Sequence, residues 1–201
     1  MVRIVLGGQW RGTQESWNSL KEFKEYHNAE VYVSSHEDWK LPFDFHYHRG
    51  IQFLEDTIFR FSTNSHRNRY NYQWSGLYNC WKAFNNYWDS DDIIVRLRVD
   101  LEFPIFQLNP KPNTFHVPAK EWHAPPFPKE LICNDQLSYG YKDVMDKYLQ
   151  LPYTFNWNYP RQIGAINMHN GIYSIEEMTR NHLYDKGIEL ETFDLIYHKK
   201  E

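Results

Sequence analysis

The first part of the chain alternates short apolar runs with one amphipathic stretch. Residues 2–6 form an apolar run that stops at a Gly-Gly pair, which predicts a buried strand entering a tight loop. Thr13 is a plausible N-cap, and apolar residues recur at helical spacing from there to Tyr26. The β-branched, alternating stretch at 29–35 predicts a second strand. Strand, helix and strand in so few residues indicate a parallel pair.

Further along, the clearest pattern is an amphipathic helix followed by a strand. Apolar residues recur at helical spacing from Trp74 to Trp88, after a polar loop predicted over 62–72, and the β-branched run 93–100 is the strongest strand signal. Residues 104–128 hold seven of the ten prolines, which predicts a long, largely irregular excursion of the kind that usually carries function. The other predicted elements are a helix at 51–59, a strand at 131–133, a polar turn at 134–136, a helix at 141–149, a helix opened by Ser174 and closed by Gly187, and a strand at 188–197.

This alternation of strands and helices favours an α/β fold. We expect a single domain over residues 1–201, either whole or cut from a longer chain, with three α/β/α layers. Its central sheet should be mostly parallel, with about six strands.

The composition is rich in aromatic residues, which make up 18% of the chain, while all hydrophobic residues reach only 41%. Such rings can fill a core or stack on sugars and bases. Helical spacing predicts that four tryptophans lie in the core: Trp17, Trp74, Trp81 and Trp88. Four others fall in predicted loops, where they could stack on a ligand: Trp10, Trp39, Trp122 and Trp157.

Charge and cysteine content narrow the class of protein. A net charge of −4 lacks the basic excess of a protein that holds nucleic acid through phosphates. The first apolar run is too short for a signal sequence or a membrane span. Two cysteines, Cys80 and Cys133, are too few for a disulfide framework. We therefore expect a soluble, cytoplasmic protein with no nucleic-acid partner.

Ligands of open parallel sheets bind beyond the carboxyl ends of the strands, so polar residues that follow each strand are the candidates for a site. Together they offer backbone N–H groups, arginine and carboxylate, an inventory suited to a nucleotide. A Gly-Gly pair after a strand can equally be a simple turn. The candidates for contact with a nucleotide cofactor or donor are Gly7, Gly8, Gln9, Arg11, Ser35, His36 and Trp74.

Arg96 and Arg98 alternate with apolar residues in the third strand, so both point to one face of the sheet, where a parallel sheet normally buries apolar groups. Two arginines there need partners. They could pair with acids under the helices, or one could reach a diphosphate. Both alternatives stay open.

Several residues could hold a metal. Asp89-Ser90-Asp91 has the form of a D-x-D metal clamp, but it precedes its strand and should lie at the edge opposite the ligand. Asp100, at the other end of that strand, is the better candidate, because carboxylate oxygens suit Mg²⁺ or Mn²⁺. His169 is a further candidate ligand. His46 and His48 have H-x-H spacing but no carboxylate pattern to complete a hydrolase site.

At the run from Asp92 to Leu101 the chain resembles a group of nucleotide-sugar glycosyltransferases of lipopolysaccharide, capsule and other surface glycans, whose pattern there is roughly Y-D-x-V-I-R-x-R-P-D-L. Four shorter matches follow the same order: residues 8–11 resemble their G-x-x-R loop, 29–34 their A-D-V-F-I-H strand, 134–136 their N-D-Q, and 176–188 their closing E-x-x-L-x-x-H-L-x-x-x-G-I. His36 and Val99 replace a tryptophan-bearing ending and a proline of the group's pattern.

The resemblance implies a type A glycosyltransferase fold, a UDP-sugar donor and a divalent metal, Mn²⁺ or Mg²⁺. Asp100 matches the metal aspartate, and Arg98 stands where the usual D-x-D has its first acid. Gly8 and Arg11 would lie near the nucleotide, and Asp135 near the transferred sugar, which makes Asp135 and Arg98 the candidate catalytic residues.

The expected activity is transfer of a hexose, such as glucose from UDP-glucose, to a hydroxyl of a surface or capsid-type glycan acceptor. The alternative is a non-catalytic glycan-binding module that uses the loop tryptophans. A metal hydrolase built on His46 and His48 is a third possibility.

Overall fold

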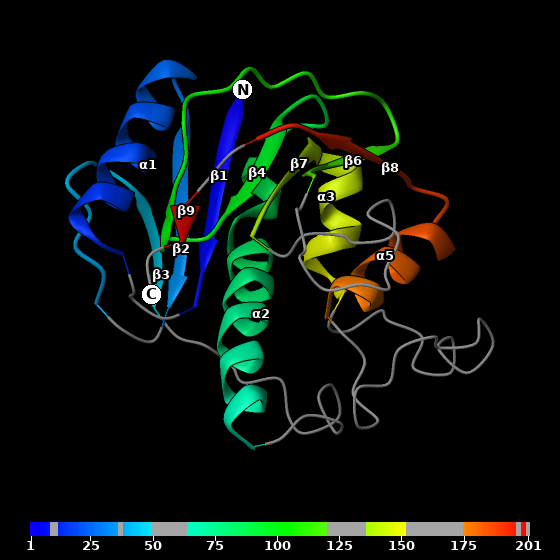
Figure 1. The fold of residues 1–201 in the computed structure, drawn as a ribbon, viewed down its shortest axis with the longest axis horizontal. Helices are drawn as coiled ribbons and strands as arrows, with labels where there is room; N and C mark the ends of the chain where they lie inside the picture. The colour runs from blue at the N-terminus through cyan, green and yellow to red at the C-terminus, as the bar shows by residue number, and fades with distance from the viewer. Residues whose placement is uncertain are drawn as a thin grey trace.

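A computed structural model of the chain describes residues 1–8, 12–35, 38–49, 64–119, 136–151, 175–195 and 198–199. Seven strands form the central sheet in the order β3-β2-β1-β4-β7-β6-β8 (Figure 1). Their bounds are β1 Val2–Gly7, β2 Glu30–Ser35, β3 His46–Arg49, β4 Ile93–Leu97, β6 Thr114–Pro118, β7 Leu137–Tyr141 and β8 Glu189–Phe193. A separate antiparallel pair joins β5 (Leu101–Glu102) to β9 (His198–Lys199).

The central sheet is mixed, as six strands run in one direction and β7 runs against them. β3, β2, β1 and β4 pair in parallel, as do β6 and β8, whereas β7 pairs antiparallel with β4 and with β6. The expected mostly parallel sheet of an α/β fold is confirmed, with one reversed strand near its centre. Because β7 runs in the opposite direction, it begins at the edge of the sheet where the other six strands end.

Helices cover both faces of this sheet and form the expected three layers. α1 (Gln14–Tyr26) lies on one face, and α2 (Asn64–Phe84), α3 (Lys142–Leu149) and α5 (Ile175–Asp185) lie on the other (Figure 1). The turn η1 (Asn85–Tyr87) follows α2 directly. We call the face under α2 and α3 the α2 face, and the face under α1 the α1 face.

Alternation along the strands divides the core between these two faces. Val5 and Ile94 point to the α2 face and pack with Trp74 and Tyr148, and Ile4 and Val95 point to the α1 face. Three of the four tryptophans predicted as core are buried, at 6%, 0% and 5% exposure for Trp17, Trp74 and Trp88. The fourth, Trp81, is partly buried against the core, and its Nε1 donates to Asp146 at 2.8 Å.

The α1 helix begins where the sequence predicts. Thr13 accepts a hydrogen bond from the Ser16 backbone, while the Ser16 hydroxyl accepts one from the Thr13 backbone, which closes a capping box. The buried stripe of this helix is Trp17, Leu20 and Phe23.

The first part of the predicted proline-rich excursion is a cover for the α1 face. Phe106 packs against Phe23 and Phe193, at ring centroid distances of 5.1 and 5.4 Å, and its carbonyl lies 3.0 Å from His27 Nε2. Residues 114–118 then form β6 inside the sheet. This part of the excursion therefore contributes to the fold, and the expectation that the excursion carries function stays a prediction.

Three local predictions were wrong. β3 was missed because His46–Arg49 has no apolar run, and α2 begins at Asn64, inside the stretch predicted as a loop. β7 begins at Leu137, between the turn predicted at 134–136 and the helix predicted from 141, where no strand was predicted. The strand predicted at 131–133 and the helix at 51–59 lie outside the described residues. Gly187 ends α5 as predicted, with φ +69° and its N–H donating to the Tyr184 carbonyl at 2.9 Å.

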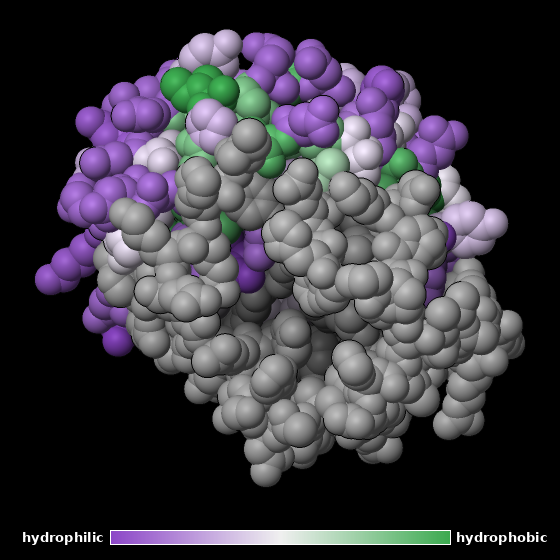
Figure 2. Space-filling model, in the orientation of Figure 1, coloured by the Kyte–Doolittle hydropathy of each residue, from purple (hydrophilic) through white to green (hydrophobic). Residues whose placement is uncertain are grey.

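In the view of Figure 1, the described surface at the top of the molecule is mostly hydrophilic, with small hydrophobic groups between (Figure 2). Among the described helices, none is long and apolar enough to cross a membrane.

Candidate functional site

The candidate site lies at the edge where β1, β2 and β4 end and β7 begins. We call it the carboxyl edge. Register places Ser34 of β2 opposite Gly7 of β1, and Leu97 of β4 opposite Leu137 of β7. Beyond that last pair, the Arg98 backbone N–H donates to the Gln136 carbonyl at 3.0 Å. Residues distant in sequence therefore meet at one edge.

The end of β1 is in direct backbone contact with α2. An ideal Cβ placed on Gly76 would lie 2.9 Å from both the carbonyl carbon and the Cα of Gly7, and nearer still to the Gly8 nitrogen. Gly8 has φ +108°, a conformation that favours glycine. The sequence prediction did not include Gly76, although an isolated glycine in a helical pattern is a signal of such close approach.

A hydrogen bond joins Ser35 to Gly8. The Ser35 hydroxyl donates to the Gly8 carbonyl at 2.7 Å, and the Gly8 N–H donates to the Ser34 carbonyl at 3.4 Å. Tyr47 of β3 donates to the Ser35 carbonyl at 3.2 Å. Ser35 is fully buried. These contacts show that Gly8 and Ser35 shape the carboxyl edge, and their predicted contact with a nucleotide stays a prediction.

Arg98 and Asp100 form a two-point ion pair at the end of β4. Nε of Arg98 donates to one carboxylate oxygen of Asp100 at 3.0 Å, and Nη2 donates to the other at 2.6 Å. Both side chains are mostly buried, at 19% and 12% exposure. Charge-assisted bonds of this geometry are strong and fix the orientation of the arginine. The two residues of the resembled motif therefore act together.

A metal needs more ligands than this pair supplies. Both oxygens of Asp100 already accept from Arg98, and no cluster of three His, Cys, Asp or Glu side chains forms within the described ranges. Divalent ions of this type take six or more oxygen ligands, although water and phosphate supply several of them. The described residues thus offer one carboxylate, Asp100, which by itself does not make a metal site.

Several predicted site residues lie outside the described residues. They are Gln9, Arg11, His36, Asp135 and His169, together with Trp10, Trp122 and Trp157. Their predicted roles stay predictions.

Two tryptophans that were predicted to contact a ligand are buried in the core and not exposed at the site. Trp74, named among the donor contacts, is fully buried and packs on Tyr148, with ring centroids 5.3 Å apart. Trp39, predicted as a loop residue near a ligand, is 6% exposed, and its centroid lies 6.2 Å from that of Trp17. Both rings are therefore part of the core.

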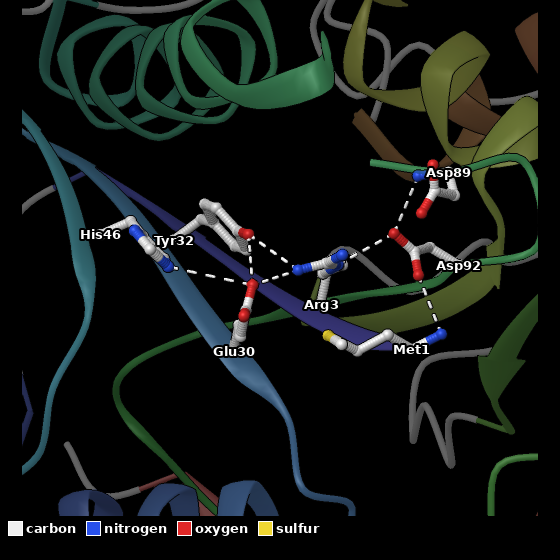
Figure 3. A network of polar contacts seen from close by, with 7 residues as sticks. All are labelled: Met1, Arg3, Glu30, Tyr32, His46, Asp89 and Asp92. Atoms are coloured by element: carbon white, nitrogen blue, oxygen red, sulfur yellow. Dashed lines mark hydrogen bonds and ion pairs between the residues drawn. The ribbon is translucent and has the colours of Figure 1, made fainter. Parts of the chain in front are cut away.

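The literal D-x-D lies at the opposite edge, as predicted. Asp89 and Asp91 are exposed and precede β4, where the neighbouring Asp92 anchors a polar network (Figure 3). Asp92 accepts from Arg3 Nε, from the N-terminal amine and from the Asp89 backbone, at 2.9, 2.8 and 2.9 Å. Arg3 also contacts Glu30 and donates to Tyr32 Oη at 3.0 Å.

The same network contains one histidine of the H-x-H pair. His46 Nε2 lies 3.9 Å from Glu30, and its ring stacks on Tyr32 at 4.6 Å (Figure 3). Burial and the bond to Glu30 raise the pKa of Tyr32 to about 12. These contacts are structural, and within the described ranges they do not assemble a hydrolase centre.

Sequence reasoning missed one further polar residue near the carboxyl edge. Ser138 on β7 was missed because that strand was not predicted, whereas Gln136, named in the predicted polar turn, lies directly before β7. A serine between two apolar or aromatic strand residues gave little signal by itself.

No protein-family model matches this chain, and no curated protein matches its sequence. Among solved structures, one that is similar is a glycosyltransferase involved in the glycosylation of the major capsid of PBCV-1. It is 14% identical, the alignment covers 96% of this chain and 81% of that chain, and the TM-score is 0.49. Similarity at this level carries no conclusion about activity.

Proposed function

We propose that this protein is a glycosyltransferase that uses a UDP-sugar donor. The observation that carries the proposal is the meeting of separate motifs at one edge. The end of β1, the end of β2, the Arg98–Asp100 pair and Gln136 all lie at the carboxyl edge. These segments belong to the motifs by which the chain resembles nucleotide-sugar transferases.

The proposed reaction breaks the bond between the sugar anomeric carbon and the diphosphate oxygen. UDP leaves with the electron pair of that bond, and an acceptor hydroxyl oxygen bonds to the anomeric carbon and releases its proton. Arg98 brings positive charge to the edge where the anionic leaving group departs, and Asp100 holds that arginine in place. Mn²⁺ or Mg²⁺ stays a prediction from the resemblance, because both oxygens of Asp100 already accept from Arg98, and no step of the proposed reaction depends on a metal.

Hexose as the transferred group and a surface or capsid-type glycan as the acceptor remain finer predictions from the resemblance. Asp135 is the residue proposed to orient sugar hydroxyls.

The test is titration of UDP and UDP-glucose, each with and without Mn²⁺, by calorimetry and thermal shift. We expect stabilisation by the nucleotide, and Asp100→Asn should weaken UDP binding about tenfold or more, because Arg98 loses the two charged contacts that hold it in place. The matched control is the double variant D89N/D91N, which removes the exposed acids of the literal D-x-D and should leave binding unchanged. Negligible binding by the wild-type protein under all four conditions would rule the proposal out.

Turnover is tested separately by UDP release from UDP-glucose in the presence of an acceptor panel. Release that depends on both an acceptor and Asp100 supports a transferase. Glycan binding without any nucleotide binding would instead favour the glycan-binding module.

A further inference from the structure

Arg96 is a charged side chain that is buried in the core and has no counterion among the described residues. It lies on β4, is 1% exposed, and is among the largest fully buried side chains. Its Nε and Nη1 have no hydrogen-bond partner within the described part of the chain. An arginine carries its charge throughout the accessible pH range, and burying an unpaired charge is strongly unfavourable. A bound anion would compensate the charge of such a residue.

Two buried hydroxyls on the same face share this condition. Ser138 of β7 lies directly opposite Arg96, and Ser34 of β2 lies opposite Gly7, two residues beyond the β1 partner of Arg96. Both serines are fully buried, and neither Oγ has a partner among the residues described. Three strands of the sheet, β2, β4 and β7, thus present unsatisfied hydrogen-bonding groups to the α2 face.

These groups lie toward the carboxyl edge of the α2 face. The rest of that face is filled by apolar residues such as Val5, Ile94 and Phe115. Arg96 is two residues before Arg98, and a strand advances only about 3.3 Å per residue, so a side chain as long as arginine spans that separation. The polar group is therefore within reach of a ligand held by the Arg98–Asp100 end of β4.

The geometry points to a buried oxyanion site made by Arg96 with the hydroxyls of Ser138 and Ser34. This inference rests on the proposed function, because it assigns the site to an anionic group of the donor. A guanidinium offers a planar fork that matches phosphate and carboxylate oxygens, and serine hydroxyls add further donors. The oxyanion is a phosphate of the donor or a carboxylate on its sugar.

The experiment compares wild-type protein with Arg96→Met by thermal shift and calorimetry. The probes are inorganic pyrophosphate, UDP, UDP-glucose and UDP-glucuronate. Because methionine keeps an unbranched apolar stem and removes the unpaired buried charge, the ligand-free variant should melt about 3–8 °C higher than wild type. The same variant should bind the anionic probe about 30-fold more weakly or worse. A purely structural arginine would not give this combination.

The probes separate the two sources of the oxyanion. Equal losses for pyrophosphate, UDP and UDP-glucose assign the site to the diphosphate. A loss confined to UDP-glucuronate assigns it to a carboxylate on the sugar. Either result supports the site.

The matched control is Arg3→Met, which changes a buried arginine on the same face that has acid partners. It should melt below wild type and keep wild-type affinity for every probe. If Arg96→Met does not yield folded protein, Arg96→Lys keeps the charge without the fork and should weaken binding about tenfold.

The inference would be overturned if Arg96→Met bound all four probes as wild type does, whether or not its melting temperature fell. If both proteins then bind nucleotide equally, the proposed function still stands. Conversely, Arg96-dependent binding of pyrophosphate without binding of any nucleotide keeps the oxyanion site and removes the proposed function.

Discussion

Two arginines lie on the same face of the central sheet, near opposite edges, and their surroundings differ. Arg3, on β1, is 7% exposed and is held by Asp92, Tyr32 and Glu30 (Figure 3). Arg96, on the neighbouring strand β4, is 1% exposed, and within the described residues its Nε and Nη1 have no partner. Burial is similar for the two side chains, but only one has its charge compensated.

The difference shows that burial alone does not reveal the purpose of a charged residue. A paired arginine joins strands and helps to hold the fold, and removing it leaves its acid partner uncompensated. An unpaired arginine lowers stability, and proteins retain such residues mainly where a ligand will use them. The amino edge of this sheet is therefore built for stability, and we propose that the carboxyl edge is built for binding.

The largest expected effect is on the paired arginine. Arg3→Met should lower the free energy of unfolding by about 3–5 kcal/mol, because Asp92 is 2% exposed and loses a charged partner. Urea denaturation monitored by tryptophan fluorescence measures this loss. Arg3→Lys, which keeps the charge, should lose less. A fully stable Arg3→Met protein would break the comparison, since the network would then contribute nothing.

A smaller effect is expected at the acid partner, and it should depend on pH. Burial opposes ionisation of Asp92, but bonds from the N-terminal amine, the Asp89 backbone and Arg3 outweigh it and hold the pKa of Asp92 below its usual 3.8. A carboxyl group with a lowered folded pKa contributes stability above its unfolded pKa and loses it as pH falls through the folded value. Asp92→Asn should therefore cost about 2 kcal/mol at pH 7.

The measurement for Asp92 is a pair of denaturation series, one for wild type and one for Asp92→Asn, from pH 7 down to about pH 2. The two stabilities should converge below pH 3.8, where the wild-type carboxyl begins to protonate. A difference that stays constant over this range would mean that the charge of Asp92 is not what stabilises the edge.

The smallest effect on stability, about 1–2 kcal/mol, is expected where α2 touches β1. Alanine at position 76 should gain about 1 kcal/mol of helix propensity, but its Cβ would press on the backbone of Gly7 and Gly8, which cannot yield as a side chain can. Gly76→Ala should therefore be less stable and should also bind UDP more weakly, because the carboxyl edge must shift.

A suitable control for this variant is Gly187→Ala. That residue has φ +69°, and no atom lies within 4 Å of an added Cβ, so it tests backbone strain without crowding. It should cost about 1 kcal/mol and leave UDP binding unchanged. If Gly76→Ala proves as stable as wild type, the close approach does not set the position of α2.

The sequence predicted elements where the local pattern was strong. The β1–α1–β2 unit and β4 have apolar runs, a capping residue and glycine stops, so their positions followed from local rules. The edge strand β3 and the first half of α2 have mostly polar sequences, and only their neighbours in the fold make them strand and helix. No local pattern could supply that information.

Part of the candidate site was predicted from the sequence, although not every residue lies there for the reason that the sequence suggested. Asp100 and Arg98 were placed correctly at the end of β4, but their ion pair depends on the turn after the strand, which spacing does not reveal. Gln136 lies at the expected edge for a different reason, because it precedes an antiparallel strand. That Arg96 has no acidic partner among the described residues could not be predicted from the sequence, because it depends on which side chains surround Arg96 in the fold.

The strand order of the sheet also has a consequence for folding. β1 and β2 are joined by one helix and can pair from a short stretch of chain, whereas β4 pairs with β1 across a far longer stretch that contains β2, β3 and α2, and β7 pairs with β4 in turn. Pairing of distant strands is slow, because a long loop must close before any contact forms. We expect the centre of the sheet to be completed late, and the edge that carries Arg98 and Gln136 to form only when most of the chain is already in place.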